Sequence, residues 1–137
     1  MSGDSRHDEH APDAPPSIGP GRVVQAFRYS IDGLAGTWRT EGAFRQEVLI
    51  AAVLVPLSVF LQVTLVEHVL LVGSVLMVII VELLNSSMEA AIDRISLDRH
   101  PLSKKAKDTG SAAVLLAVLL ATIVWGAIVV PLTLPLR

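Results

Sequence analysis

Three carboxylates and one carboxamide interrupt a long apolar stretch of the chain, residues 69–93. They are Glu82, Asn85, Glu89 and Asp93. Offsets of 3, 7 and 11 residues from Glu82 place them on one narrow face of an α-helix, because each residue turns the helix by about 100°. Carboxylate oxygens are the ligands that Mg²⁺ prefers, although the same groups can also join neighbouring helices through hydrogen bonds. Helix geometry favours a functional role for this face over a structural one.

The stretch belongs to a chain with the composition of a membrane protein. Hydrophobic residues make up 52% of the 137 residues, and the mean hydropathy is +0.59. Three apolar runs, residues 48–66, 69–92 and 112–134, are each close to the ~20 residues that a helix needs to cross a bilayer. We therefore predict an all-α membrane protein with three spanning helices. An ionisable side chain inside a span costs on the order of 3 kcal/mol, so Glu82 and Glu89 require polar surroundings.

Charge and composition exclude several other classes of protein. A net charge of -2 indicates no nucleic acid partner, and the absence of cysteine excludes disulfides and thiol catalysis. The N-terminus lacks an apolar core after a basic start, so we expect no cleavable signal. The sequence contains no Walker A loop, no Gly-x-Gly-x-x-Gly loop and no protein-kinase catalytic-loop motif.

Two segments precede the first apolar run. Residues 1–21 are rich in Pro, Asp, His and Gly, and we expect a disordered tail in which His7 and His10 are solvated rather than metal-bound. Apolar residues recur at helical spacing over residues 22–39, which predicts an amphipathic helix at the cytoplasmic membrane surface. Thr40 is expected to cap the following helix, with Glu41 in its first turn.

Basic residues predict the orientation in the membrane. They precede the first run and separate the second from the third: Arg22, Arg28, Arg39, Arg45, Arg94, Arg99, Lys104, Lys105 and Lys107. The turn expected near Glu67 and His68 contains none. By the positive-inside rule, the N-terminus and the second connection are cytoplasmic. The polar face of the second span then lies at the cytoplasmic end.

Carboxylates and cations therefore gather at one membrane surface. Glu41 reaches the same side as Glu82 and Glu89, beside the five cations of residues 94–108. This combination suits Mg²⁺ and a polyphosphate. Positive-inside bias and attraction to anionic lipid explain most of these cations equally well, and Glu41 and Glu47 can be ordinary helix-start residues.

Three ordered segments resemble the signature segments of prokaryotic diacylglycerol kinases. They read Glu41-Gly-Ala-Phe-Arg-Gln-Glu47, Val81-Glu-Leu-Leu-Asn-Ser-Ser-Met-Glu-Ala-Ala-Ile-Asp-Arg94 and Ala106-Lys-Asp-Thr-Gly-Ser-Ala-Ala-Val114. The similarity extends from about residue 22 to the third span. It implies a homotrimer of three-helix protomers in the bacterial inner membrane. Each protomer would carry an N-terminal surface helix and transfer the γ-phosphate of ATP to diacylglycerol, giving phosphatidic acid.

The resemblance also implies roles for individual residues. Glu82 matches the general base and Asn85 the group that orients it, while Glu41 and Glu89 match the ligands of Mg²⁺. The positions that match ATP contacts are Arg22, Tyr29, Glu41, Glu89, Asp98, His100, Lys107 and Asp108. The positions that match the lipid site are Trp38, Phe44, Arg45, Gln46, Glu47, Glu82, Ser111 and Trp125. Ile31-Asp32 departs from the Trp-Lys expected there, and Asp93 receives no role.

Two alternatives stay open at this point. Undecaprenol kinases share the Glu-x-x-Asn-x-x-x-Glu pattern, although the Phe-Arg-Gln-Glu and Lys-Asp-Thr-Gly-Ser segments favour diacylglycerol as the substrate. A non-catalytic helix bundle or small-ion channel, in which the polar face is structural, is the alternative from a different class. Turnover of Mg-ATP with a lipid alcohol separates the enzymes from the bundle.

Overall fold

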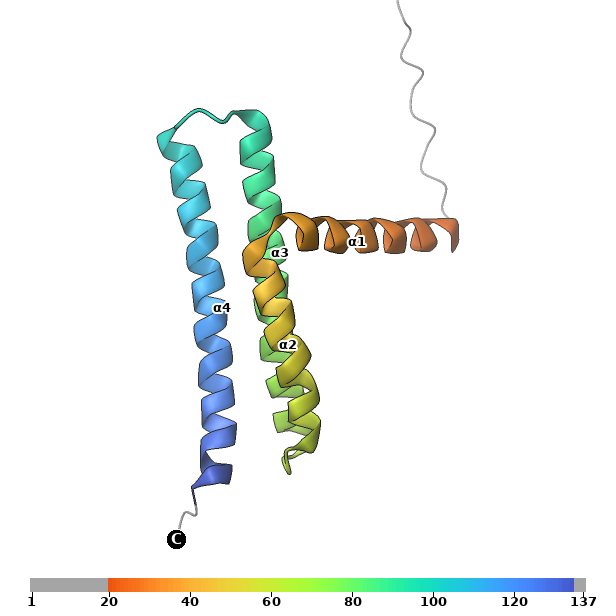
Figure 1. Ribbon diagram of the computed structural model, residues 1–137, viewed down its shortest axis with the longest axis vertical. Coiled ribbons are helices and arrows are strands. Elements are labelled where there is room, and N and C mark those ends of the chain that lie inside the picture. The colour runs from red at the N-terminus through yellow and green to blue at the C-terminus, as the bar shows by residue number, and fades with distance from the viewer. Residues whose placement is uncertain (1–19, 135–137) are drawn as a thin grey trace, which may run out of the picture. The chain divides into compact units, whose positions relative to one another are not determined.

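The computed structural model describes residues 20–134, which form four α-helices and contain no strand (Figure 1). The helices are α1 (Pro20–Thr40), α2 (Gly42–Phe60), α3 (Leu65–Ile95) and α4 (Pro101–Thr133). Helices α2, α3 and α4 are long and apolar enough to cross a membrane. The prediction of an all-α membrane protein with three spans is confirmed. Of the expected N-terminal tail, residues 1–19 lie outside the described residues, including both histidines.

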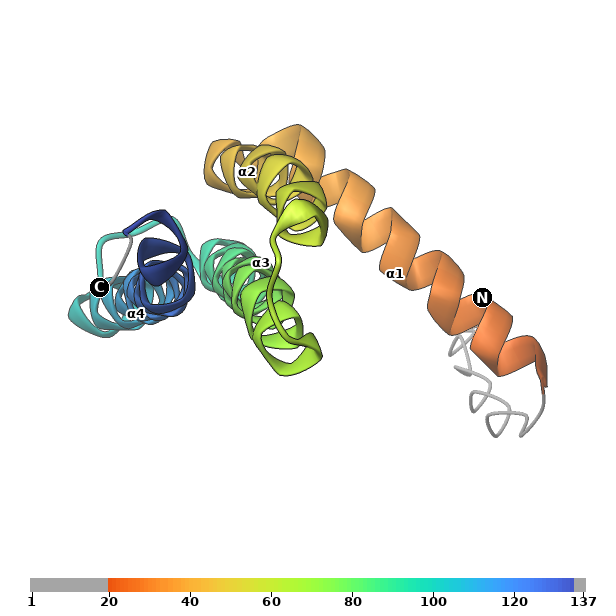
Figure 2. The same cartoon turned by 90° about the horizontal axis from the view of Figure 1, so that it is seen from below.

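Helix α3 is the central helix of the bundle formed by α2, α3 and α4. It packs against both of the others, and the end-on view in Figure 2 shows α2 and α4 beside it. Its buried side chains recur every three or four residues: Leu71, Ser74, Val75, Val78, Glu82 and Ser86. Such spacing keeps them on one stripe of the helix. The stripe that packs the bundle therefore becomes polar at Glu82, and packing holds the polar groups in place.

Helix α4 approaches α3 through small side chains. Its buried residues are Gly110 and Ala117. Further along, the Trp125 Nε1 group donates a hydrogen bond to the Leu71 carbonyl oxygen at 3.2 Å. Leu71 is fully buried, so water cannot reach this position to accept a hydrogen bond from the indole N–H. The Leu71 carbonyl oxygen accepts it instead. Small residues and one long aromatic residue thus fix α4 against α3.

The connection between α2 and α3 lies earlier than the apolar runs predicted. We expected the first span to continue to residue 66, with the turn near Glu67 and His68. Instead α2 ends at Phe60, and Thr64 caps α3. The Thr64 backbone N–H donates to Glu67 Oε2 at 2.8 Å, and the Glu67 backbone N–H donates to Thr64 Oγ1 at 3.3 Å. This reciprocal capping box starts the helix where hydropathy alone indicates no break.

The junction of α1 and α2 corrects the expected role of Thr40. Glu41, rather than Thr40, occupies the N-cap position of α2, and its side chain makes no capping hydrogen bond. The Thr40 hydroxyl donates to the Gly36 carbonyl oxygen at 3.3 Å and so belongs to α1. Arg45 Nη1 donates to the carbonyl oxygens of Trp38 and Arg39 at 3.2 and 3.3 Å. The junction is therefore held by arginine, and the Glu41 carboxylate stays available.

Candidate active site

Three carboxylates from two helices line one pocket of about 310 Å³, which we call the acidic pocket. Glu41 comes from the start of α2, and Glu82 and Glu89 come from α3. Further lining comes from Ala43, Asn85, Ser86, Ser111 and Val114. Glu82 is only 4% exposed, and it lies close enough to Glu41 and Glu89 for their negative charges to repel it. Because like charges are concentrated at a half-enclosed surface, the acidic pocket favours a bound cation.

The carboxylates differ in how they are hydrogen-bonded. Asn85 Nδ2 donates to Glu89 Oε1 at 3.0 Å, whereas the resemblance implied that Asn85 orients Glu82. Within residues 20–134, no hydrogen bond or ion pair holds the Glu82 carboxylate. A buried carboxylate without a partner carries a large desolvation cost. Glu82 is therefore the carboxylate in this pocket with the strongest need for a polar ligand.

The donor set fits Mg²⁺ that arrives with a polyphosphate. Among residues 20–134, no three His, Asp or Glu side chains meet closely enough to hold a metal ion by themselves. Mg²⁺ is usually held by one or two carboxylates, while phosphate oxygens and water complete its octahedral shell. Glu41 and Glu89 provide two carboxylates from different helices beside one pocket. The chemistry matches a metal brought by substrate rather than a permanently enclosed one.

A second pocket, of about 590 Å³, lies at the connection between α3 and α4, and we call it the loop pocket. Its charged and imidazole side chains are Asp93, Asp98, Arg99, His100, Lys104, Lys107 and Asp108. Lys107 Nζ donates to Asp93 Oδ1 at 2.6 Å and so joins α4 to α3. Lys107 also interacts electrostatically with Glu89 of the acidic pocket. The two pockets are therefore neighbours through Lys107.

Several side chains of the loop pocket also have local structural roles. His100 caps α4, and its Nδ1 accepts a hydrogen bond from the Leu102 backbone N–H at 3.2 Å. Lys104 forms an ion pair with Asp108 one turn along α4. The Asp98 backbone N–H donates to Ser96 Oγ at 2.9 Å. Of these groups, His100 keeps its Nε2 and Asp98 its carboxylate for a ligand.

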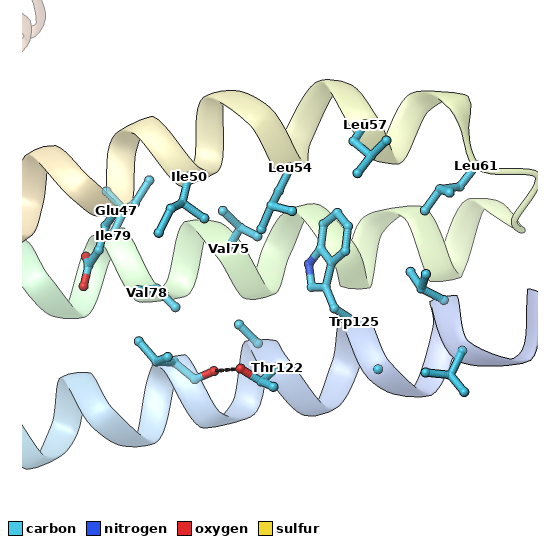
Figure 3. A pocket seen from close by; sticks show the side chains of 15 residues that line it. Glu47, Ile50, Leu54, Leu57, Leu61, Val75, Val78, Ile79, Thr122 and Trp125 are labelled. Carbon is cyan, nitrogen blue, oxygen red and sulfur yellow. Dashed lines mark hydrogen bonds between the residues drawn. The ribbon is translucent and has the colours of Figure 1, made fainter. Parts of the chain in front are cut away.

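A third pocket, of about 560 Å³, is an apolar groove between α2, α3 and α4 (Figure 3). Aliphatic side chains of all three helices line most of it, and the Trp125 ring points from α4 towards the other two helices. Glu47 lies at one end and Leu61 at the other. Glu47 Oε2 is buried without a hydrogen-bond partner, and this carboxylate interacts electrostatically with Glu82. The groove therefore presents one polar group at the end nearest the acidic pocket.

The remaining residues predicted for the lipid site line none of these three pockets. Phe44 is buried at 3% exposure, and Arg45 holds the helix junction. Trp38 and Gln46 are exposed side chains near the same junction. Arg22 and Tyr29 belong to residues 20–33, a separate unit of the structure, so their nucleotide contacts remain predictions.

The sequence also contained signals that our prediction did not use. Ser86 lies four residues after Glu82 and hence on the same helix face, yet our prediction considered it only as a hydrogen-bonding group between helices and gave it no place in the site. Arg99 and Lys104 line the loop pocket although the positive-inside rule accounted for them. The aliphatic residues of the apolar groove carry no local signal, because any membrane helix contains similar residues.

The arrangement of the three pockets defines a class of protein. The three spanning helices carry an apolar groove, a cluster of three carboxylates and a loop pocket that contains several cations, in that order. These surfaces suit a lipid chain, a divalent cation and a phosphate group, respectively. The class is a membrane protein whose site brings together an apolar ligand and a charged one.

Comparison with known proteins identifies the family. The family model of prokaryotic diacylglycerol kinase matches residues 28–129, which include the whole acidic pocket and the whole loop pocket. The chain is 48% identical over 107 residues to a diacylglycerol kinase of Pseudomonas aeruginosa, covering 78% of this chain and 87% of that one. It is 45% identical over 106 residues to the Haemophilus influenzae protein, covering 77% and 90%, and 47% identical over 104 residues to that of Escherichia coli K12, covering 76% and 85%.

The chain belongs to the prokaryotic diacylglycerol kinase family. It is accordingly an enzyme, a lipid kinase that transfers a phosphoryl group to an alcohol group. The alternative of a non-catalytic helix bundle is thereby excluded.

Proposed function

We propose that the protein transfers the γ-phosphate of ATP to the free hydroxyl group of diacylglycerol, forming phosphatidic acid and ADP with the help of Mg²⁺. One observation carries the proposal beyond family membership. A series of charged neighbours, Glu47, Glu82, Glu89 and Lys107, leads from the apolar groove through the acidic pocket to the loop pocket. A lipid in the groove and a nucleotide in the loop pocket would therefore both reach Glu82 and Glu89.

The apolar groove would hold an acyl chain of the lipid. Glu47, at the end near Glu82, has an unpaired buried oxygen that can accept a hydrogen bond from a glycerol hydroxyl group. Trp125 supplies a broad apolar surface along the chain. The family resemblance adds Trp38, Phe44, Arg45, Gln46 and Ser111 to this proposed lipid site.

The loop pocket would hold the phosphates of ATP. Lys107 neutralises phosphate charge, and Asp98, His100 and Asp108 contact the rest of the nucleotide, together with Arg22 and Tyr29 of α1. Glu41 and Glu89 hold Mg²⁺, which when bound neutralises the charge that develops on the phosphates. These assignments are supported by the oxygen donors of the acidic pocket and by the proximity of Lys107 to Glu89.

Glu82 would act as the general base. The lipid hydroxyl oxygen forms a bond to the γ-phosphorus, its proton passes to a Glu82 carboxylate oxygen, and the bond from the γ-phosphorus to the leaving ADP oxygen breaks. Phosphoryl transfer depends mainly on position and charge neutralisation, so one base and a cluster of ligands suffice. The hydrogen bond that Asn85 donates holds the Glu89 carboxylate in position to bind Mg²⁺.

The quaternary and cellular setting follows the same family argument. We propose a homotrimer in the bacterial inner membrane, with the N-terminus and the α3–α4 connection in the cytoplasm. Residues 22–137 would form the kinase domain after an N-terminal tail of residues 1–21, and the first part of the domain would lie on the membrane surface. The distribution of basic residues supports this orientation.

The decisive test is a comparison of two lipid alcohols. The purified protein in lipid nanodiscs is given Mg-ATP labelled at the γ-phosphate and either diacylglycerol or undecaprenol. We expect label to enter phosphatidic acid at a rate well above that for undecaprenyl phosphate. Faster labelling of undecaprenol would assign the protein to the alternative lipid.

Replacement of Trp125 by leucine tests the groove. The change keeps an apolar side chain but removes the indole surface and the hydrogen bond that Nε1 donates to the Leu71 carbonyl oxygen. We expect the KM for diacylglycerol to rise about 3- to 10-fold, an effect near 1 kcal/mol. The KM for ATP should not change, because Trp125 lies outside the loop pocket. A change in the KM for ATP alone would contradict the assignment of the groove to lipid.

Replacement of Asp93 by asparagine tests the loop pocket. The change removes the charged partner of Lys107, whose ammonium group would then no longer be held between α3 and α4. Both side chains are partly exposed, so the pair is worth at most about 1 kcal/mol, and we expect the KM for ATP to rise about 3- to 5-fold. Steady-state kinetics with saturating diacylglycerol measures this, and an altered lipid KM with an unchanged ATP KM would speak against it.

A further inference from the structure

Gly110 of α4 lies where no larger residue fits. A Cβ atom built on Gly110 would overlap Asn85 Oδ1, and it would lie 2.5 Å from the Met88 methyl carbon and 3.2 Å from Asn85 Cγ. Among the other glycines of residues 20–134, Gly73 and Gly126 have no such neighbour within 4 Å. The close approach of α4 to α3 at this point therefore depends on glycine.

The two neighbours differ in how easily they can move. The Met88 methyl group ends a flexible side chain and can turn aside at little cost. The Asn85 amide cannot, because its Nδ2 donates to Glu89 Oε1 at 3.0 Å. A carboxylate only accepts hydrogen bonds, so the NH₂ group must face Glu89, and the Oδ1 atom must face Gly110. Asn85 Oδ1 is buried there and has no hydrogen-bond partner of its own. The orientation of the amide is therefore imposed by the hydrogen bond to Glu89, and it is possible because Gly110 has no side chain to fill the space that Oδ1 occupies.

We infer that Gly110 is a positioning residue for the metal ligand Glu89 and acts through Asn85. Helix α4 leaves the space that the Asn85 amide occupies, and the amide in turn fixes the Glu89 carboxylate towards the acidic pocket. This inference rests on the proposed role of Glu89 as a Mg²⁺ ligand. Gly110 belongs to a different helix from Glu89 and has no polar side chain. The inference therefore adds a residue without polar atoms in its side chain to those that determine metal affinity.

Replacement of Gly110 by alanine should displace the Asn85 amide and free the Glu89 carboxylate. Groups that orient a metal ligand typically contribute 10- to 100-fold to metal affinity, so we expect binding to weaken about 10-fold. Asn85→Ala should weaken binding to a similar degree. In the double variant Asn85→Ala/Gly110→Ala the added methyl group has room, so we expect no further loss beyond that of Asn85→Ala alone.

The experiment uses Mn²⁺ in place of Mg²⁺. It measures the binding of Mn²⁺ to the full chain in nanodiscs in the presence of a non-hydrolysable ATP analogue. Electron paramagnetic resonance reports the free Mn²⁺ concentration without any need for turnover. Gly73→Ala is the matched control, since its methyl group meets open space, and it should bind as the wild type does. Non-additivity between positions 85 and 110 distinguishes action through Asn85 from a general packing defect.

Three results would overturn the inference: unchanged affinity in Gly110→Ala, additive losses in the double variant, or recovery of affinity when Met88→Ala is added to Gly110→Ala. If Gly110→Ala does not fold, the comparison of Asn85→Ala with the double variant still decides, because a further loss there excludes action through Asn85. Wild-type turnover of diacylglycerol is measured in parallel. Turnover combined with any of the three results overturns this inference alone, whereas absence of turnover on either lipid overturns the proposed function.

Discussion

Glu82→Gln is expected to abolish turnover while the protein still assembles and binds Mg-ATP. Glutamine keeps the size of the side chain but cannot accept the proton of the lipid hydroxyl. A general base typically contributes about 10²- to 10⁴-fold to the rate, so kcat should fall by at least about 10²-fold. Because no residue of 20–134 is hydrogen-bonded to the Glu82 carboxylate, the substitution removes no structural partner. Size-exclusion chromatography, nucleotide binding and single-turnover phosphorylation measure the three properties separately.

Glu47→Gln is the matched control for this experiment. Glu47 is the carboxylate at the end of the apolar groove, and it interacts electrostatically with Glu82. In our proposal Glu47 binds the lipid, so its replacement should raise the KM for diacylglycerol more than it lowers kcat. If Glu47→Gln abolished kcat while Glu82→Gln kept near wild-type activity, the base would be Glu47.

The sequence allowed the polar face of the second span to be predicted because helical periodicity is a local property. Glu82, Asn85 and Glu89 are spaced so that any α-helix brings them together, and all three line the acidic pocket. Hydropathy likewise indicated three spans, since the length of a span depends on the bilayer and hardly on neighbouring helices. The fold class and the grouping of these three side chains at one pocket were therefore accessible from the sequence.

Helix boundaries were less accessible because short polar motifs overrode hydropathy. The capping box of Thr64 and Glu67 starts α3 inside the expected first span, and the Thr-x-x-Glu spacing was visible in the sequence. The predicted role of Thr40 was wrong because its hydroxyl donates a hydrogen bond to the Gly36 carbonyl oxygen of α1. A capping rule that considers only the next helix does not anticipate this bond. Both differences arise from competition between local hydrogen bonds.

Contacts between helices could not be predicted from periodicity. Asp93 and Lys107 are 14 residues apart and meet only because the α3–α4 connection brings two helix ends together. The apolar groove depends on the distances between three helices, and the close approach at Gly110 depends on the position of α4 against α3. These features are set by tertiary packing, and so are the proximity of Glu47 to Glu82 and that of Lys107 to Glu89, on which the proposed function rests.

Glu89→Ala and Glu41→Ala are expected chiefly to raise the Mg²⁺ concentration needed for activity. Each substitution removes one of the two proposed carboxylate ligands, and we expect the half-saturating Mg²⁺ concentration to rise by at least about 10-fold. Rates at very high Mg²⁺ should recover in part, since Glu82 is retained as the base.

The same two variants distinguish a metal site from structural carboxylates. Glu41 makes no capping hydrogen bond, and both residues repel Glu82 electrostatically, so removing either carboxylate relieves repulsion in the metal-free protein. We therefore expect the thermal unfolding temperature without Mg²⁺ to stay constant or rise in Glu41→Ala, and to stay constant in Glu89→Ala, where the loss of the hydrogen bond from Asn85 offsets the relief of repulsion. Glu67→Ala is the contrasting control, because it breaks the capping box of α3 and should lower that temperature without changing the Mg²⁺ requirement. A lower unfolding temperature and an unchanged Mg²⁺ requirement in Glu41→Ala and Glu89→Ala would make these residues structural.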